Sequence, residues 1–179
     1  MTYSTDRGSL VSPEDVATLL KSAYYAPPGA FVEVGVYRGG TARALYSLAE
    51  EQGRALYLFD TFSGHPDTDG DPDHYVGKYA DCADPVALQA ELPNAHIIVG
   101  RFPDTLPALP PVAFVHADAD LYGVTRDICT LLPPMMVARG RLYFDDYPYP
   151  TCAGVRRAVD EAFPHRVILS NQKALVVLP

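Results

Sequence analysis

Two pairs of aspartates follow apolar runs and are the residues of this sequence best suited to chemistry. Asp118 and Asp120 lie in the segment FVHADADLYG, and Asp145 and Asp146 lie in RLYFDDYP. A carboxylate at the end of a buried strand is costly unless a cation or several hydrogen bonds compensate it. Without a cation, mutual repulsion would raise at least one of the pKa values. Asp118, Asp145 and Asp146 therefore predict a site for a hard cation, Mg²⁺ first, with Mn²⁺ or Ca²⁺ as alternatives.

Other residues near this cluster are predicted to have structural roles. Asp120 directly precedes LYGVTRDI and suits the N-cap of a helix there. The lack of nearby His and Cys ligands argues against zinc. His116 lies inside the preceding apolar run and is expected to be a hydrogen-bonded core residue. Helix caps and loop salt bridges are the alternative explanation for the acidic cluster as a whole.

A glycine-rich turn, EVGVYRGGTA, follows the first apolar run. Gly35 permits a tight turn, while Gly39 and Gly40 let the backbone approach a ligand without a Cβ atom between them. The spacing G-x-x-x-G-G differs from the dinucleotide fingerprint and from the P-loop. Glu33, inside the apolar run, needs a cationic partner, which the ammonium group of a ligand would supply. A plain strand-to-helix turn is the alternative.

Asp60 ends a second apolar run, in LFDTF, about twenty-five residues after the glycine turn. An acid at this place can accept hydrogen bonds from two ribose hydroxyls. The ribose of NAD and that of S-adenosylmethionine would suit it equally. A cap or an ordinary loop acid is the alternative.

Residues 62–80 are rich in Gly, Pro and Asp and predict a long loop. Loops of this length in a compact domain are usually functional or mobile, so we expect a mobile lid. His65 and His74 lie in this loop. Either of them could approach a substrate as a general base, and His74 is our candidate; solvated loop histidines are the alternative.

The elements that position these residues alternate along the chain. Ser12-Pro13-Glu14-Asp15 predicts the start of a helix over about 13–25. Strand and helix patterns then alternate five times, and two short strands joined by Asn-Gln close the chain as a hairpin. This order predicts one α/β domain over 1–179, with a Rossmann-like, doubly wound, mostly parallel sheet and an antiparallel C-terminal hairpin. Ligands of such sheets bind beyond the carboxyl ends of the strands, where the acids described above are expected.

Composition excludes several classes of function. The 179 residues carry a net charge of −8, which argues against nucleic acid as a partner. No apolar stretch has the length of a membrane span, and the N-terminus has no signal-peptide core. Three widely spaced cysteines form neither a disulfide framework nor a zinc pattern. We therefore expect a cytoplasmic protein with a small-molecule ligand.

Four segments together resemble the macrocin O-methyltransferase family in order and spacing: FVEVGVYRGGTA, LYLFDTFSGHPD, FVHADADLYGVTRDI and RLYFDDYPYPTCAGVRRAVDEAF. These are metal-dependent S-adenosylmethionine enzymes that act on natural-product sugars, and the glycine turn is also distantly similar to that of the catechol methyltransferases. The resemblance implies that Glu33 and Gly35 hold the methionine part of the cofactor, Asp60 binds its ribose and TFSG lies beside the adenosine. It also implies that Asp118, Asp145 and Asp146 bind magnesium and that Asp118 is a base.

The resemblance gives a complete set of expected site residues. The cofactor-binding residues are Glu33, Gly35, Tyr37, Arg38, Gly39, Thr41, Asp60, Thr61, Phe62, Ser63 and Asp118; the metal ligands are Asp118, Asp145 and Asp146; the catalytic candidates are Asp118 and His74. The implied activity is Mg²⁺-dependent methyl transfer from S-adenosylmethionine to a hydroxyl of a small natural-product, sugar or diol substrate.

Two departures from these families affect the expected mechanism. About thirty residues precede the first strand, so we expect a lid over the substrate that is short or supplied by the partner in a homodimer. Leu121 stands where the catechol enzymes carry a catalytic lysine, so a lysine base is not expected. One alternative is an S-adenosylmethionine-binding protein of this fold that transfers no methyl group and acts as a rearrangement catalyst or a regulatory partner. An NAD-dependent oxidoreductase would retain Asp60 but leaves the metal cluster unexplained.

Overall fold

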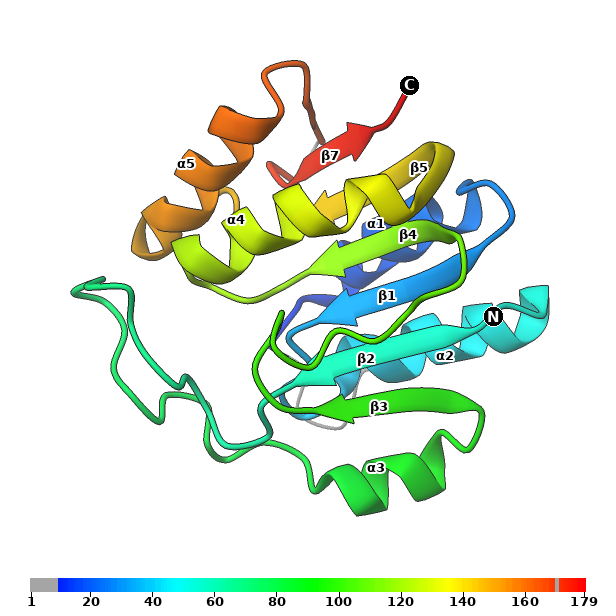
Figure 1. Cartoon of the computed structure of the whole chain (residues 1–179), viewed down its shortest axis with the longest axis horizontal. Coiled ribbons are helices and arrows are strands. Elements are labelled where there is room, and N and C mark those ends of the chain that lie inside the picture. Colours follow the sequence, from blue (N-terminus) through cyan, green and yellow to red (C-terminus); the bar gives the residue numbers. More distant parts are fainter. Residues whose placement is uncertain (1–9, 170) are drawn as a thin grey trace.

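The computed structural model describes residues 10–169 and 171–179, so the first nine residues, on which the expectation of no signal peptide partly rests, lie outside it (Figure 1). The helices are α1 (Pro13–Tyr24), α2 (Gly40–Gln52), α3 (Pro85–Glu91), α4 (Tyr122–Leu131) and α5 (Ala153–Ala162), with 3₁₀ turns η1 (Pro133–Met135) and η2 (Pro150–Cys152). The strands are β1 (Ala30–Val34), β2 (Leu56–Asp60), β3 (Ala95–Val99), β4 (Val112–Ala117), β5 (Met136–Phe144), β6 (Val167–Ile168) and β7 (Ala174–Val177).

The strands form one seven-stranded sheet in the order β3-β2-β1-β4-β5-β7-β6. Strands β1 to β5 are parallel, and β7 pairs antiparallel with both β5 and β6. The predicted α/β fold, with a doubly wound parallel sheet and a C-terminal antiparallel hairpin, is confirmed. The hairpin inserts β7 between β5 and the edge strand β6.

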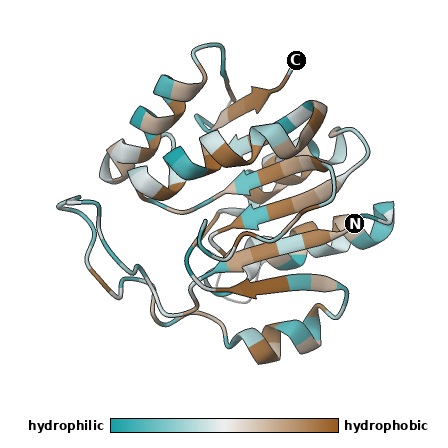
Figure 2. Cartoon of the chain, viewed as in Figure 1, coloured by the Kyte–Doolittle hydropathy of each residue, from teal (hydrophilic) through white to brown (hydrophobic). Residues whose placement is uncertain are grey.

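Each face of the sheet has its own apolar core (Figure 1). Helices α1 and α2 lie on one face, where Leu19 and Leu45 are fully buried together with Leu88 of α3. Helices α4 and α5 cover the other face through Ile128 and Val159. The strands are mainly hydrophobic, while the helices carry hydrophilic segments as well (Figure 2). The helices therefore bury one stripe each, as the sequence periodicity predicts.

The helix starts that the sequence predicts are formed by the expected side chains. The Ser12 hydroxyl accepts a hydrogen bond from the N–H of Asp15 at 3.1 Å, and Pro13 begins α1. Asp84, which directly precedes Pro85 as is typical of an N-cap, accepts a hydrogen bond from the N–H of Val86 at 3.0 Å at the start of α3. In the described ranges, no helix combines the length and the apolar character that crossing a bilayer requires.

The sheet reverses its direction of growth at β1, which lies between β2 and β4. At such a switch point the loops that leave the carboxyl ends of the strands diverge and leave a crevice for a ligand. Residues 61–84, which join β2 to α3, contain no helix or strand and extend from this end of the sheet (Figure 1). The fold therefore brings the glycine turn, Asp60, both acid pairs and the long loop to one edge.

Candidate active site

A cavity of about 300 Å³ lies at the carboxyl ends of β1, β2, β4 and β5. Its volume is within the range of small-ligand pockets. The predicted site residues that line it are Gly35, Tyr37, Arg38, Thr41, Asp60, Thr61, Asp118, Asp145 and Asp146. Glu33, Gly39, Phe62, Ser63 and His74, although described, are not part of its lining. The cavity thus gathers most, but not all, of the predicted residues.

Gly35 lets the ends of β1 and β4 meet at this cavity. Its φ of +93° favours glycine, and a Cβ atom would lie 1.7 Å from the carbonyl oxygen of Asp118. The N–H of Asp118 donates to the carbonyl oxygen of Val34 at 2.9 Å. The tight turn after β1 therefore places the backbone of Asp118 directly against the glycine.

Asp60 links the glycine turn to the loop after β2 through hydrogen bonds. Its Oδ2 accepts hydrogen bonds from the N–H groups of Val36 at 2.7 Å and Tyr37 at 2.9 Å. Its Oδ1 accepts from the N–H of Phe62 at 2.7 Å. A carboxylate has about four lone-pair sites; three are engaged by backbone amides, and the Thr61 hydroxyl donates to Oδ1 over a long 3.5 Å. Binding of both ribose hydroxyls, as predicted from the sequence, would therefore require Asp60 to release a backbone group.

Replacing Asp60 with asparagine is expected to lower the free energy of unfolding by about 1–3 kcal/mol. The asparagine amide can accept at one end only, and its NH₂ group would face backbone N–H donors at the other. Urea denaturation of Asp60→Asn and of the control Asp104→Asn, whose side chain is exposed, measures this difference. Equal stability of the two variants would mean that the turn does not depend on the Asp60 carboxylate.

Glu33 finds its partner inside the protein. Its Oε1 lies 2.8 Å from Nδ1 of His116, and both side chains are fully buried. The two residues face each other in the β1–β4 register, so the predicted hydrogen-bonded core role of His116 is confirmed. Oε2 of Glu33 has no hydrogen-bond partner among the described residues. His116 thus supplies a partner for one oxygen of the acid only.

The three predicted metal ligands converge. One oxygen each from Asp118, Asp145 and Asp146 lies within 4.8 Å of the others. Lys173, 1% exposed, contacts this group: its Nζ lies 2.8 Å from Oδ2 of Asp145 and 3.0 Å from the hydroxyl of Tyr149. Oδ1 of Asp145 is buried and has no hydrogen-bond partner among the described residues. Sequence reasoning missed Lys173, although a lysine at the head of the apolar run ALVV is unusual.

The electrostatics of the cluster favour a bound cation. The pKa of Asp118 is raised well above its usual value, first by burial and then by the charges of Asp146 and Asp145. The pKa of Asp146 is also raised, first by burial and then by Asp120 and Asp145. Burial would lower the pKa of Lys173, but the Asp145 carboxylate reverses this effect and raises it. The single ammonium group of Lys173 therefore does not neutralise the three carboxylates of Asp118, Asp145 and Asp146.

Asp120 does not have the role predicted for it. Helix α4 has Leu121 at its N-cap without a side-chain bond, so the prediction that Asp120 caps this helix is wrong. The N–H of Gly123, in the first turn of α4, instead donates to Oδ2 of Asp69 in the long loop. The N–H of Asp120 donates to Oδ2 of Asp146 at 2.9 Å, and the positive φ of 59° turns the Asp120 side chain toward the loop.

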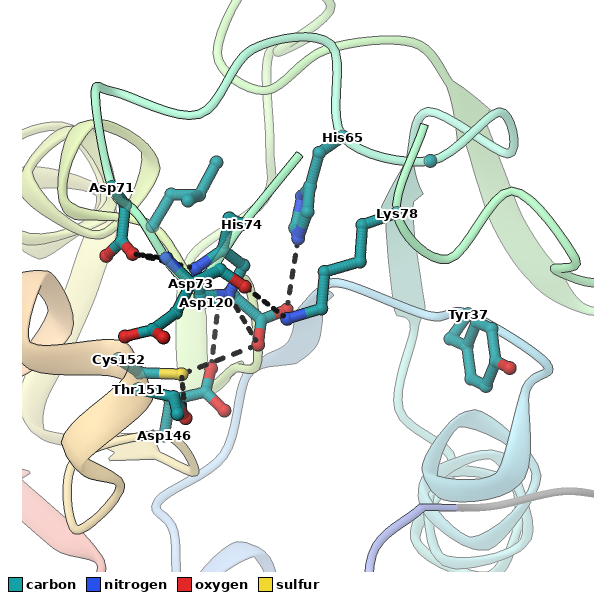
Figure 3. Close-up of polar contacts among 12 residues, drawn as sticks. Tyr37, His65, Asp71, Asp73, His74, Lys78, Asp120, Asp146, Thr151 and Cys152 are labelled. Carbon is teal, nitrogen blue, oxygen red and sulfur yellow. Dashed lines mark hydrogen bonds and ion pairs between the residues drawn. The ribbon is translucent and has the colours of Figure 1, made fainter. Parts of the chain in front are cut away.

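Two histidines of the loop meet Asp120 (Figure 3). Nε2 of His65 lies 3.5 Å from Oδ2, and Nε2 of His74 lies 3.6 Å from Oδ1. The side chain of His74 is 0% exposed and that of His65 12%, so the alternative of solvated histidines is wrong. The sulfur of Cys152 also approaches Asp120 Oδ1, at 3.6 Å. His65, His74 and Cys152 are thus distant from Asp120 in sequence but close to it in space.

Comparisons with known proteins give the family of this chain. The profile of the macrocin O-methyltransferase family (TylF) matches residues 20–171. The chain belongs to this family. Mycinamicin III 3''-O-methyltransferase of Micromonospora griseorubida is 30% identical over 155 residues, which cover 75% of this chain and 60% of that protein. A tetracenomycin-C rhamnosyl 4'-O-methyltransferase of Streptomyces olivaceus is 30% identical over 145 residues, covering 70% and 55%.

Solved structures show that the fold is that of methyltransferases. A calicheamicin methyltransferase superimposes with a TM-score of 0.77 at 21% identity and covers 90% of this macrocin O-methyltransferase family member and 76% of its own chain. A structure named cmcI-D160 Mg-SAM superimposes with a TM-score of 0.62 at 14% identity, covering 96% and 74%. The chain spans 55–60% of the length of the curated relatives it matches.

Proposed function

We propose that this chain is a Mg²⁺-dependent O-methyltransferase that uses S-adenosylmethionine and acts on a hydroxyl of a small sugar, diol or other natural product. The observation that carries the proposal is the convergence of Asp118, Asp145 and Asp146 at the edge of the switch-point cavity. Membership of the family, its sugar-modifying relatives and a neighbour named as a Mg-SAM complex support it.

The residues present fit both groups. Oδ1 of Asp145 is a buried oxygen without a protein partner, and carboxylate oxygens are the ligands that Mg²⁺ prefers. For the cofactor, Gly35, Tyr37 and Asp60 line one end of a cavity whose size suits a small ligand. Arg38 and Thr41 also line the cavity and belong to the proposed binding surface. Glu33, Gly39, Phe62 and Ser63 would act by shaping the turn and the loop.

The chain's own residues bind and orient the reactants. When bound, S-adenosylmethionine would supply the methyl group, and Mg²⁺ held by Asp118, Asp145 and Asp146 would lower the pKa of a substrate hydroxyl. Asp118 accepts the proton of the substrate hydroxyl and passes it to solvent. His74, whose Nε2 lies 3.6 Å from the cavity-lining Asp120, is the second candidate for the base. Residues 61–84 exclude water, and the main contribution is alignment.

Calorimetric titration of S-adenosylmethionine into the protein, alone and with Mg²⁺, tests the proposal. We expect micromolar binding that becomes tighter with Mg²⁺, because the cofactor cavity and the acid cluster share Asp118. A sugar diol is then added, and the product mass should rise by one methyl group. Binding without a methylated product from a panel of sugars would favour the binding protein without methyl transfer. No heat in either titration would exclude the methyl donor.

A further inference from the structure

The long loop and the end of β4 form a second group of metal-binding side chains. One ring nitrogen each from His65 and His74 and one oxygen of Asp120 lie within 4.8 Å of one another. His74 is completely buried, yet neither of its ring nitrogens has a hydrogen-bond partner among the described residues. Nε2 of His65 is also buried and has no hydrogen-bond partner among the described residues. Carboxylate oxygens lie 3.3–3.6 Å from these nitrogens without forming hydrogen bonds of good geometry, so the arrangement leaves room for a further group between them.

The spacing of the atoms suits a metal better than hydrogen bonds. The two Nε2–carboxylate distances, 3.5 Å for His65 and 3.6 Å for His74, exceed the usual 2.7–3.2 Å for N–H···O bonds. Metal–ligand bonds of about 2.0–2.2 Å in a tetrahedral site place neighbouring ligand atoms about 3.3–3.6 Å apart. Each imidazole lies at such a distance from one oxygen of Asp120, His65 from Oδ2 and His74 from Oδ1, and the three side chains offer ligand atoms within 4.8 Å of one another.

Surrounding groups hold the ligands in place. Oδ1 of Asp71 lies 3.3 Å from Nδ1 of His74, and this leaves Nε2 directed at Asp120 (Figure 3). A carboxylate behind a histidine is the usual support of a metal-bound imidazole. Asp71 is itself bonded by the N–H of Asp73 at 2.8 Å. Asp120 is fixed from the other side, because its N–H donates to Asp146.

We propose that His65, His74 and Asp120 bind a Zn²⁺-class cation, separate from the three-aspartate site, that ties the loop to the end of β4. Imidazole ligands suit zinc and its neighbours, whereas Mg²⁺ prefers oxygen. Three protein ligands leave a fourth position for water or a ligand oxygen, and His65 and Asp120 line the cavity. This site goes beyond the proposed function, and a metal-bound His74 leaves Asp118 as the base.

Lys78 is the cation of the chain that competes with a metal at this place. It acts electrostatically on Asp120, and its Nζ donates to the carbonyl oxygen of Asp73 at 3.4 Å. In the metal-free alternative, Lys78 compensates Asp120 without any ion. That alternative predicts that the histidines do not affect zinc affinity, so the two explanations can be separated.

Zinc affinity is measured by competition with a chromophoric chelator on metal-stripped protein. We expect one zinc equivalent to bind the wild type, and His65→Asn and His74→Ala to bind it at least ~10-fold more weakly. His165→Ala, an exposed histidine between α5 and β6, is the matched control and should bind as the wild type does. Circular dichroism checks the fold of His74→Ala, and the partly exposed His65 provides a variant that is easier to fold.

Two further measurements locate the ion. Co²⁺ in place of zinc should give the visible spectrum of a tetrahedral site in the wild type and lose it in both histidine variants. Zinc should also slow tryptic cleavage after Lys78 in the wild type and in His165→Ala but not in His65→Asn. Asp118→Asn removes a ligand of the proposed Mg²⁺ site but none of the proposed zinc ligands, so it should bind zinc as the wild type does. Failure of the zinc proposal can therefore be distinguished from failure of the Mg²⁺ proposal. Absence of zinc binding, or equal affinity of the histidine variants and the wild type, would overturn the proposal.

Discussion

Asp118→Asn is expected to lower kcat/KM by at least ~100-fold, about 2.7 kcal/mol, while the protein remains folded. Asp118 lines the cavity, belongs to the three-carboxylate group and is the proposed base. Asparagine keeps the shape of the side chain but removes the charge that binds the cation and accepts the proton. Steady-state kinetics with S-adenosylmethionine and the best acceptor measure the effect, and Asp104→Asn is the control for an exposed acid.

The same variant is informative about stability. Without metal, the asparagine removes a charge that repels Asp145 and Asp146, so the free energy of unfolding should equal or exceed that of the wild type. Mg²⁺ at about one hundred times its Kd should stabilise the wild type by about 2.7 kcal/mol, and the variant by much less. Urea denaturation with Mg²⁺ and with chelator gives the four values. Full activity in the variant, or equal stabilisation by Mg²⁺, contradicts the assigned role of Asp118.

Lys173→Met is expected to destabilise the protein by about 3–5 kcal/mol, the largest stability effect of the variants considered. The ammonium group of Lys173 is buried against Asp145, and its removal leaves three neighbouring carboxylates without that cation. The urea midpoint measures the loss. Lys21→Met, an exposed lysine in the last turn of α1, is the matched control and should change stability by less than about 0.5 kcal/mol.

A second substitution separates charge from packing. Adding Asp145→Asn to Lys173→Met removes one of the uncompensated carboxylates, so the double variant should be more stable than Lys173→Met alone. Mg²⁺ should also restore part of the stability of the single variant. A loss below about 1 kcal/mol in Lys173→Met would mean that the carboxylates are neutralised by protonation instead.

Local patterns were enough to predict the sheet, because alternation and helix starts depend on neighbouring residues. Ser12 and Asp84 cap the helices that they precede, and the acids fall at adjacent strand ends as expected. Contacts across strands depend on register. Glu33 meets His116 because β1 and β4 align them, and the pairing of Phe144 with Ala174 brings Asp145 opposite Lys173. The sequence does not specify that β7 inserts beside β5, so the contact of Lys173 with Asp145 could not be predicted.

The surroundings of Asp120 were the part of the site least accessible to prediction. Its immediate sequence is that of a helix cap, and a capping role required only local geometry. In the structure the long loop folds back toward the end of β4. It brings His65 and His74 next to Asp120, which is more than forty residues away in the sequence. Long-range contacts of an irregular loop leave no periodic signal in the sequence, so the contacts of His65 and His74 with Asp120 were not predicted.

The bond between Gly123 and Asp69 couples the start of α4 to the loop. The helix has no side-chain cap of its own, and the acceptor for this amide comes from a residue 54 positions earlier. Any movement of the loop that withdraws Asp69 leaves an amide of the first turn without that acceptor. By thermodynamic linkage, a ligand that holds the loop against β4 also stabilises the first turn of α4, and changes in that helix alter the affinity of the ligand in return.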